Sequence, residues 1–249
     1  MGEALSDSVA VVTGGSSGIG LAIARRFAGE GARVFVTGRR AAELDEAVGL
    51  IGDGAVAVRC DSSKLDDLDE LYRTVEERAG RVDVLVANAG GGTRGALGAV
   101  TEADFDTIFA SNVKGVFFTV QKALPLLVDG ARIILTGSTA ASKAMPGSSV
   151  YGASKATVRS FARSWIVELA HRGIRVNVLA PGPVLTPGLV GAVPVDEQEA
   201  RLERMRQGVP IGRLGQPDEI AEVALFLASD ASSFVNGAEV FADGGQAQV

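Results

Sequence analysis

The chain has 249 residues, of which 47% are hydrophobic and 22% charged, and these values are ordinary for one large soluble α/β domain. Its formal net charge of −6, with no basic block anywhere, argues against a nucleic-acid-binding groove. No apolar run is long enough to span a bilayer, so we expect no membrane contact. The chain has a single cysteine, Cys60, and no secretory signal before the first strand, so we expect a reducing, cytoplasmic location.

Short apolar runs alternate with helical patterns along the whole chain. Strands are predicted at 9–13, 33–37, 55–60, 82–87, 132–136, 175–180 and 239–242, and helices at 19–30, 41–51, 64–79, 102–128, 151–171 and 217–229. The strands are apolar on both faces, which is typical of a parallel sheet covered by helices. The alternation predicts an α/β fold with a doubly wound, seven-stranded sheet in one domain, 1–249. The least regular segment, about 187–210, is expected to form a lid.

A glycine-rich segment, Thr13-Gly-Gly-Ser-Ser-Gly-Ile-Gly20, joins the first strand to the first helix. Glycine lets the backbone turn sharply and approach a pyrophosphate without a Cβ in the way. The helix N-terminus adds free N–H groups and a partial positive charge. The segment predicts a dinucleotide site, and a glycine-rich turn without a ligand is the alternative.

The end of the second strand, Val36-Thr37-Gly38-Arg39-Arg40, carries no acidic residue. An acidic side chain there would hold the adenosine ribose and repel a 2′-phosphate. Guanidinium groups instead bind phosphate through paired, charge-assisted hydrogen bonds. We therefore expect NADP(H) more than NAD(H), with Arg39 as the main phosphate contact and Arg40 and Ser16 assisting. The alternative is that both arginines are solvated residues before the second helix.

Tyr151 and Lys155 stand four residues apart and share one face of a predicted helix. A free tyrosine is a poor acid or base at neutral pH, but a cation nearby favours the phenolate. The pair can then act as a general acid and base toward a carbonyl oxygen or an alcohol. An isolated match of this kind is more often a surface helix with a half-buried tyrosine and a solvated lysine.

The match is not isolated, because Ser138 ends the apolar run upstream of Tyr151 and the glycine segment opens the chain. Together, over about residues 6–249, these motifs resemble the short-chain dehydrogenase/reductase family in its single-domain branch. The run 117–127 and the ending, with Asp243-Gly244-Gly245 and Gln248-Val249, look like those of bacterial NADP-dependent alcohol dehydrogenases and carbonyl reductases. The resemblance implies a Rossmann-type fold, a nicotinamide cofactor and a homotetramer.

The resemblance also implies catalytic roles. Tyr151 would donate its proton to the carbonyl oxygen, Lys155 would bond the nicotinamide ribose and assist Tyr151, and Ser138 would stabilise the same oxygen. Asn112 would stand where its helix is locally disturbed and hold a water that leads to solvent. From the residues alone, Asn112 is equally a polar surface side chain.

Further cofactor contacts follow from the resemblance. Asp61 would bond the adenine amino group, and Thr186 the nicotinamide carboxamide. The turn Asn88-Ala89-Gly90 matches the family except that its first asparagine is Ala87 here. The cofactor set that we expect is Gly14, Ser16, Ser17, Gly18, Ile19, Gly20, Gly38, Arg39, Arg40, Asp61, Ser62, Asn88, Ala89, Gly90, Tyr151, Lys155, Pro181, Gly182, Val184 and Thr186.

The predicted substrate pocket is mostly small and apolar, which favours a neutral ketone, aldehyde or alcohol. It comprises Gly91, Ser138, Thr139, Ala140, Met145, Tyr151, Pro183 and Leu185. No metal site is expected, since His171 is the single histidine and no acidic cluster has metal-binding spacing. Three alternatives stay open: a 3-oxoacyl-carrier-protein reductase, a sugar dehydrogenase of glucose type, and a non-catalytic NADP sensor.

Overall fold

The computed structural model describes residues 3–92 and 95–249. Seven parallel strands form one sheet in the order β3-β2-β1-β4-β5-β6-β7. They are β1 (Val9–Val12), β2 (Arg33–Gly38), β3 (Val56–Arg59), β4 (Val82–Ala87), β5 (Leu127–Thr136), β6 (Arg175–Pro181) and β7 (Glu239–Ala242). The strand order reverses between β1 and β4, and the crevice at the carboxyl ends there is where open α/β sheets bind ligands. The predicted seven-stranded Rossmann-type sheet is confirmed.

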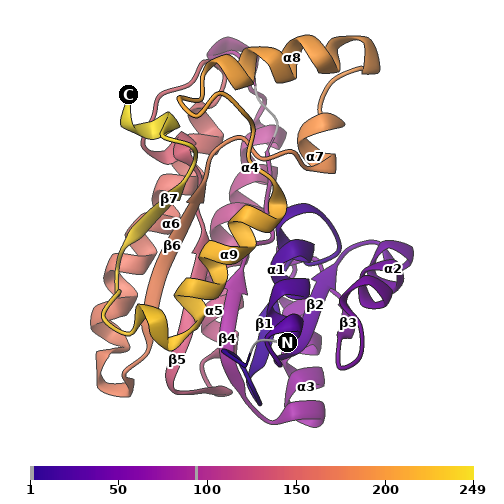
Figure 1. Ribbon diagram of the computed structural model, residues 1–249, viewed down its shortest axis with the longest axis vertical. Coiled ribbons are helices and arrows are strands. Elements are labelled where there is room, and N and C mark those ends of the chain that lie inside the picture. The colour runs from indigo at the N-terminus through magenta and orange to yellow at the C-terminus, as the bar shows by residue number, and fades with distance from the viewer. Residues whose placement is uncertain (1–2, 93–94) are drawn as a thin grey trace.

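Helices cover both faces of the sheet (Figure 1). They are α1 (Gly18–Gly29), α2 (Ala41–Ile51), α3 (Leu65–Ala79), α4 (Glu102–Phe109), α5 (Val116–Ala123), α6 (Ser149–Glu168), α7 (Pro187–Val190), α8 (Val195–Gln207) and α9 (Pro217–Ala228). Side chains of β1 alternate between two cores: Ala10 and Val12 pack with α1 and α9, whereas Val9 and Val11 pack with α3, α5 and α6. This alternation explains why the strands are apolar on both faces. None of the described helices is both long and apolar enough to cross a membrane.

The single helix predicted over 102–128 is wrong. The structure has α4, a π-helical segment over Ala110–Gly115, and α5, which ends at Ala123. A proline in a helix interior lacks an N–H group and clashes with the preceding turn, so Pro125 stops the helix. The following strand, β5, consequently begins at Leu127, five residues earlier than predicted, and pairs there with Val82 of β4.

Candidate active site

Lys155 lies inside the protein, with 4% of its surface exposed. Its Nζ atom donates to the carbonyl oxygen of Thr136 at 2.8 Å and lies 5.9 Å from the centroid of the Tyr151 ring. Burial lowers the pKa of Lys155, and the neighbouring Tyr151 partly opposes this shift. The solvated lysine of the alternative interpretation is therefore wrong, and an ammonium group shielded from water stands beside the phenol.

Ser138 follows β5 and caps a short 3-10 helix at Thr139–Ala141. Its Oγ atom accepts a hydrogen bond from the amide of Ala140 at 3.2 Å. A hydroxyl has one donor and two acceptor positions, so Ser138 can still donate to a substrate oxygen. The end of β5 thus carries both Ser138 and the carbonyl group that holds Lys155.

Asn112 is fully buried, which excludes the surface alternative. Its side chain accepts from the amide of Gly91 at 3.0 Å and donates to the carbonyl oxygen of Gly91 and to the Ser154 hydroxyl, both at 2.9 Å. The Ser154 hydroxyl donates in turn to the main-chain oxygen of Tyr151 at 2.7 Å. The π-helical segment turns Asn112 toward both partners, so this side chain ties the loop after β4 to the helix of Tyr151. The water that Asn112 was expected to hold stays a prediction.

The glycine segment has the shape that a pyrophosphate needs. Gly14 and Gly18 have φ values of +65° and +53°, a region that favours glycine. A Cβ on Gly20 would lie 2.2 Å from the carbonyl oxygen of Gly14, and one on Gly18 would lie 3.2 Å from Cγ2 of Thr186. The segment therefore fits a dinucleotide, and the structure brings Thr186 next to it from the loop after β6.

Two polar residues hold this segment to the turn after β4. The Thr13 hydroxyl accepts from the amides of Asn88 and Ala89, each at 3.0 Å, and the Asn88 side chain donates to the Thr13 carbonyl oxygen at 3.0 Å. The sequence prediction assigned Asn88 to the cofactor and missed Thr13. A polar residue ending an apolar strand is the one signal that pointed to it.

The carboxyl end of β2 brings together several residues that the sequence prediction assigned to the adenosine part of a dinucleotide. A Cβ on Gly38 would lie 2.8 Å from Oγ of Ser16, so the two predicted residues face each other. Arg39 is exposed, whereas the Arg40 guanidinium is already paired with Glu43. Arg59 of β3 lies opposite Gly38 in the sheet, and its Nε atom donates to the main-chain oxygen of Arg39 at 3.2 Å.

Arg59 was missed, although a lone charge inside an apolar strand was a visible signal. Asp61 follows two residues later and carries the expected negative charge. Although burial opposes it, hydrogen bonds from the hydroxyl and the amide of Ser63 hold the pKa of Asp61 below its ordinary value. The Ser62 side chain is buried, and among the described residues its hydroxyl has no hydrogen-bond partner.

The other predicted residues lie at the same carboxyl edge of the sheet. Exposed positions are Ser17, Gly90, Gly91 and Leu185; half-buried ones are Ile19, Ala89, Met145, Gly182 and Pro183; buried ones are Thr139, Ala140, Pro181 and Val184. The Thr139 hydroxyl donates to Oε1 of Gln246 at 3.1 Å. This contact leaves Thr139 facing the end of the chain.

A cavity of about 260 Å³ borders Tyr151. The sequence prediction missed all its other lining residues, which come from the loop after β4, from α4 and from residues 147–150 at the start of α6. They are Gly95, Ala99, Val100, Asp104, Ile108, Gly147 and Val150. Among the described lining residues Asp104 supplies the single charge, and its carboxylate is occupied by the amide and hydroxyl of Thr101 at the start of α4. The other lining residues are small or apolar. A sequence pattern cannot reveal this cavity because three separate segments form it.

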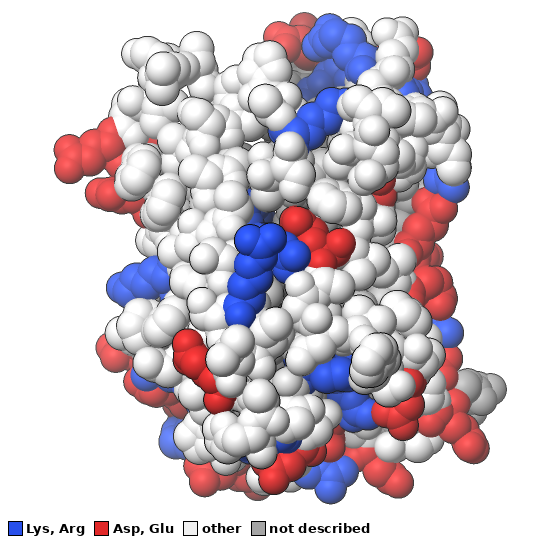
Figure 2. All heavy atoms as spheres, turned by 90° about the vertical axis from the view of Figure 1, so that its left-hand side faces the viewer, with Lys and Arg blue, Asp and Glu red and all other residues white. Residues whose placement is uncertain are grey.

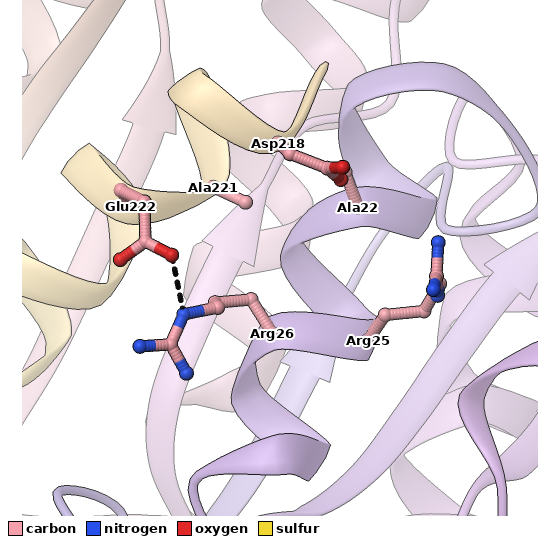
Figure 3. Close-up of a pocket in the computed structure, with 6 residues that line it drawn as sticks. All are labelled: Ala22, Arg25, Arg26, Asp218, Ala221 and Glu222. Carbon is pink, nitrogen blue, oxygen red and sulfur yellow. Dashed lines mark hydrogen bonds and ion pairs between the residues drawn. The ribbon is translucent and has the colours of Figure 1, made fainter. Parts of the chain in front are cut away.

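A second cavity, of about 290 Å³, lies between α1 and α9 and is lined by none of the predicted site residues. Figure 3 shows the Arg26 side chain reaching across it to Glu222, with an ion pair of 2.6 Å.

Within residues 3–92 and 95–249 no group of three or more His, Cys, Asp or Glu side chains is placed to hold a metal ion. Cys60 is buried, and burial raises the pKa of its thiol to about 12.

Comparisons with known proteins agree with this geometry. A family profile described as enoyl-(acyl carrier protein) reductase matches residues 14–247. An oxidoreductase of Sarocladium schorii is 45% identical over 99% of this chain and 98% of its own length. A 3-oxoacyl-[acyl-carrier-protein] reductase of Thermotoga maritima is 38% identical over 97% of this chain and 98% of its own. The solved short-chain dehydrogenase/reductase of Serratia marcescens superposes with a TM-score of 0.92 at 33% identity, covering 98% of this chain and 99% of that one. The chain therefore belongs to the short-chain dehydrogenase/reductase family of oxidoreductases, whose members bind a nicotinamide cofactor.

Proposed function

We propose that this protein is an NADP(H)-dependent oxidoreductase that interconverts a ketone or aldehyde and the corresponding alcohol. The observation that carries the proposal is the buried ammonium group of Lys155, held by Thr136 next to the Tyr151 ring. In a water-poor site an ammonium stabilises a nearby phenolate more strongly than it does in solution. Tyr151 can therefore serve as the general acid and base toward the substrate oxygen.

The proposed mechanism assigns one task to each side chain. When bound, a nicotinamide cofactor would supply the hydride for the carbonyl carbon. Tyr151 gives its proton to the carbonyl oxygen, so that the product is a neutral alcohol and the tyrosine is left as phenolate. Ser138 donates a hydrogen bond to the same oxygen while accepting from Ala140. Lys155 stabilises the phenolate and would hold the nicotinamide ribose, and solvent returns the proton by way of the Asn112 region.

The preference for NADP(H) is supported by the cations at the end of β2. Arg39 is exposed beside Gly38, and Arg59 is fixed to the main chain of Arg39. An acidic residue of an enzyme preferring NAD(H) would stand at Gly38. The Ser16 hydroxyl faces Gly38, Arg39 follows it in the chain, and Arg59 is paired with it in the sheet, so both arginines are near enough to serve a 2′-phosphate. Arg40 contributes less than expected, because Glu43 already pairs with it.

A neutral, largely apolar substrate is supported by the cavity beside Tyr151. An apolar cavity of about 150 Å³ can hold a benzene ring, so a cavity of about 260 Å³ is large enough for a substituted ring. We further propose that residues 187–210, which include α7 and α8, act as a lid over this site within one domain formed by the whole chain.

The test is the oxidation of NADPH and of NADH with a panel of carbonyl compounds, followed by loss of nicotinamide absorbance. The panel contains aryl ketones, small aldehydes and an acetoacetyl thioester, and glucose is added for the reverse reaction. Turnover of ketones with NADPH is expected. No turnover with any compound, despite tight NADPH binding, would favour the sensor that lacks catalysis.

The second candidate is a 3-oxoacyl-carrier-protein reductase, favoured by the similarity to the Thermotoga maritima enzyme. That substrate is also a ketone, so the same side chains would act on it. Turnover restricted to the acetoacetyl thioester would select this candidate, and turnover of glucose alone would select a sugar dehydrogenase.

We also propose a homotetramer. Figure 2 shows the face that carries β7 and α6, on which charged side chains are sparse. Phe234 is fully exposed, Val167 and Phe226 are 74% and 40% exposed, and large apolar side chains of this kind often mark interfaces. Light scattering tests the assembly, and a monomer would contradict it. The cytoplasmic location stays a prediction.

A further inference from the structure

Residues 243–249, which we call the C-terminal turn, fold into a compact structure with its own hydrogen bonds. The Asp243 carboxylate, 9% exposed, accepts from the amides of Gly245 at 2.9 Å and Ala247 at 2.7 Å. Gly244 and Gly245 have φ values of +61° and +87°, which only glycine adopts without strain. A short 3-10 helix follows at Gln246–Gln248. The turn therefore presents the Gln246 side chain in a fixed direction.

The C-terminal turn is bonded to the loop that follows Ser138. Gln246 accepts from the Thr139 hydroxyl through Oε1 at 3.1 Å. The Lys143 ammonium donates to the main-chain oxygens of Gln246 at 2.8 Å and Val249 at 2.6 Å. Thr139 is the residue next to Ser138 and is 3% exposed. These bonds thus hold both ends of the 139–143 loop, and with them the main chain that carries Ser138.

The same turn contacts two other segments that border the site. The Ile211 amide donates to the carbonyl oxygen of Gly244 at 3.2 Å, and a Cβ on Gly244 would lie 2.5 Å from Cγ2 of Ile211. On its other side, a Cβ on Gly182 would lie 2.8 Å from Cα of Asp243. Ile211 follows the proposed lid, and Gly182 belongs to the loop expected beside the nicotinamide. The turn is therefore packed against three loops at this edge of the sheet: the one after Ser138, the one at Ile211 and the one at Gly182.

We propose that Gln246 and Lys143 are positioning residues for Ser138. They fix the 138–143 loop against the C-terminal turn, so that the Ser138 hydroxyl is held where the substrate carbonyl oxygen binds. Gln246 acts through Thr139, to which it is hydrogen-bonded, and Lys143 acts through the turn itself. The inference rests on the proposed function, because it assigns these residues to the orientation of a group that stabilises the reacting oxygen.

The test compares three single substitutions in the C-terminal turn. Gln246→Met keeps the side-chain length and removes the acceptor, whereas Gln246→Glu keeps an acceptor oxygen. Gln248→Met is the matched control, since Gln248 lies in the same turn and is exposed. Gln246→Met is expected to lower kcat for ketone reduction about fivefold to tenfold, the value of one lost hydrogen bond. The dissociation constant for NADPH and the melting temperature should stay close to wild type. Gln246→Glu should restore kcat to within about twofold, and the control should equal wild type.

A double-mutant cycle separates positioning from general damage. In a Ser138→Ala background, Gln246→Met should lower kcat no further, because the group that it positions is gone. Independent losses, or wild-type kcat in Gln246→Met, would overturn the proposal.

Amide hydrogen exchange supplies a readout that does not depend on turnover. Exchange within 138–143 should quicken in Gln246→Met and not in Gln248→Met. Unchanged exchange would overturn the inference. A wild-type protein without carbonyl turnover whose Gln246→Met variant shows faster exchange would contradict the proposed function alone and support the role of Gln246 in holding the loop.

Discussion

The carbonyl oxygen of Thr136 accepts a hydrogen bond of 2.8 Å from the buried Lys155 ammonium, two residues before Ser138 on the same chain segment. One strand end thus holds the lysine and presents the serine. A displacement of β5 would alter both groups together. This coupling makes the end of β5 the part of the site where small changes in packing should have the largest effect on turnover.

The buried lysine predicts a pH-dependent contribution to stability. Burial lowers the pKa of Lys155 in the folded protein, so between that value and the ordinary one near ~10.5 the unfolded chain binds more protons than the native protein. Wild-type stability relative to Lys155→Met should therefore rise as the pH is raised through this window. Urea unfolding at pH values across this window measures the difference, with the exposed Lys114→Met as control. A difference that falls with rising pH would contradict the assignment.

Removal of the Tyr151 hydroxyl should abolish proton transfer and leave cofactor binding intact. Tyr151→Phe is expected to lower kcat by about a hundredfold or more. The chain's other tyrosine offers a matched control: the Tyr72 hydroxyl is buried and donates to the Thr119 carbonyl oxygen, away from the predicted site residues. Tyr72→Phe should lower the melting temperature and keep kcat near wild type. Similar kcat values for the two variants would remove Tyr151 from the mechanism.

The arginines near the carboxyl end of β2 should differ in how strongly they affect the affinity for the cofactor. Arg39→Ala is expected to raise the dissociation constant for NADPH about tenfold to a hundredfold, because charge-assisted hydrogen bonds to the phosphate are lost. Arg59→Ala should act in the same direction and less strongly. Arg40→Ala should have the smallest effect, since Arg40 is paired with Glu43. Nicotinamide fluorescence measures each constant, and an equal loss of affinity for NADH would contradict the role of Arg39.

Glu219 should lend α9 a small stabilisation that acid removes. Hydrogen bonds from the Arg213 side chain and the Gln216 amide lower the pKa of Glu219 to about 2. A carboxyl with a depressed pKa stabilises the fold above its unfolded value, and this contribution is lost as the pH falls from about 4.5 to about 2. Because the side chain is 45% exposed, Glu219→Gln should cost only about 0.5 kcal/mol at neutral pH. Unfolding curves should show the difference vanishing near pH 2, whereas the exposed Glu76→Gln tests for a general charge effect.

Much of the fold was predictable because local patterns specify it. Apolar runs separated by helical patterns were enough for the sheet, and the spacing of Gly14, Gly18 and Gly20 after the first strand marked the phosphate segment. The four-residue spacing of Tyr151 and Lys155 likewise places both on α6. In each case the informative residues are close together in the sequence.

The features that were missed depend on contacts between distant segments. The position of Arg59 next to Arg39 follows from strand register, which no single strand reveals. The bond between Thr139 and Gln246 joins residues 107 apart. The helix break at 110–115 was expected from family resemblance alone, and the hydrogen bond between Asn112 and Gly91 that accompanies it involves a residue outside the helix.

The π-helical segment Ala110–Gly115 interrupts the regular helix and at the same time places Asn112 in the site. Deleting one residue there would allow α4 and α5 to merge into a regular helix with better-formed backbone hydrogen bonds. A π-helical turn holds about one residue more than an α-helical turn, so the deletion would leave the rotation of α4 relative to α5 nearly unchanged. The residues inside the segment would be reoriented, which would withdraw Asn112 from Gly91 and Ser154. A selection for higher thermal stability can therefore favour variants with a shorter segment. Those variants would gain a regular helix and lose the hydrogen bonds that connect Asn112, through Ser154, to the main chain of Tyr151.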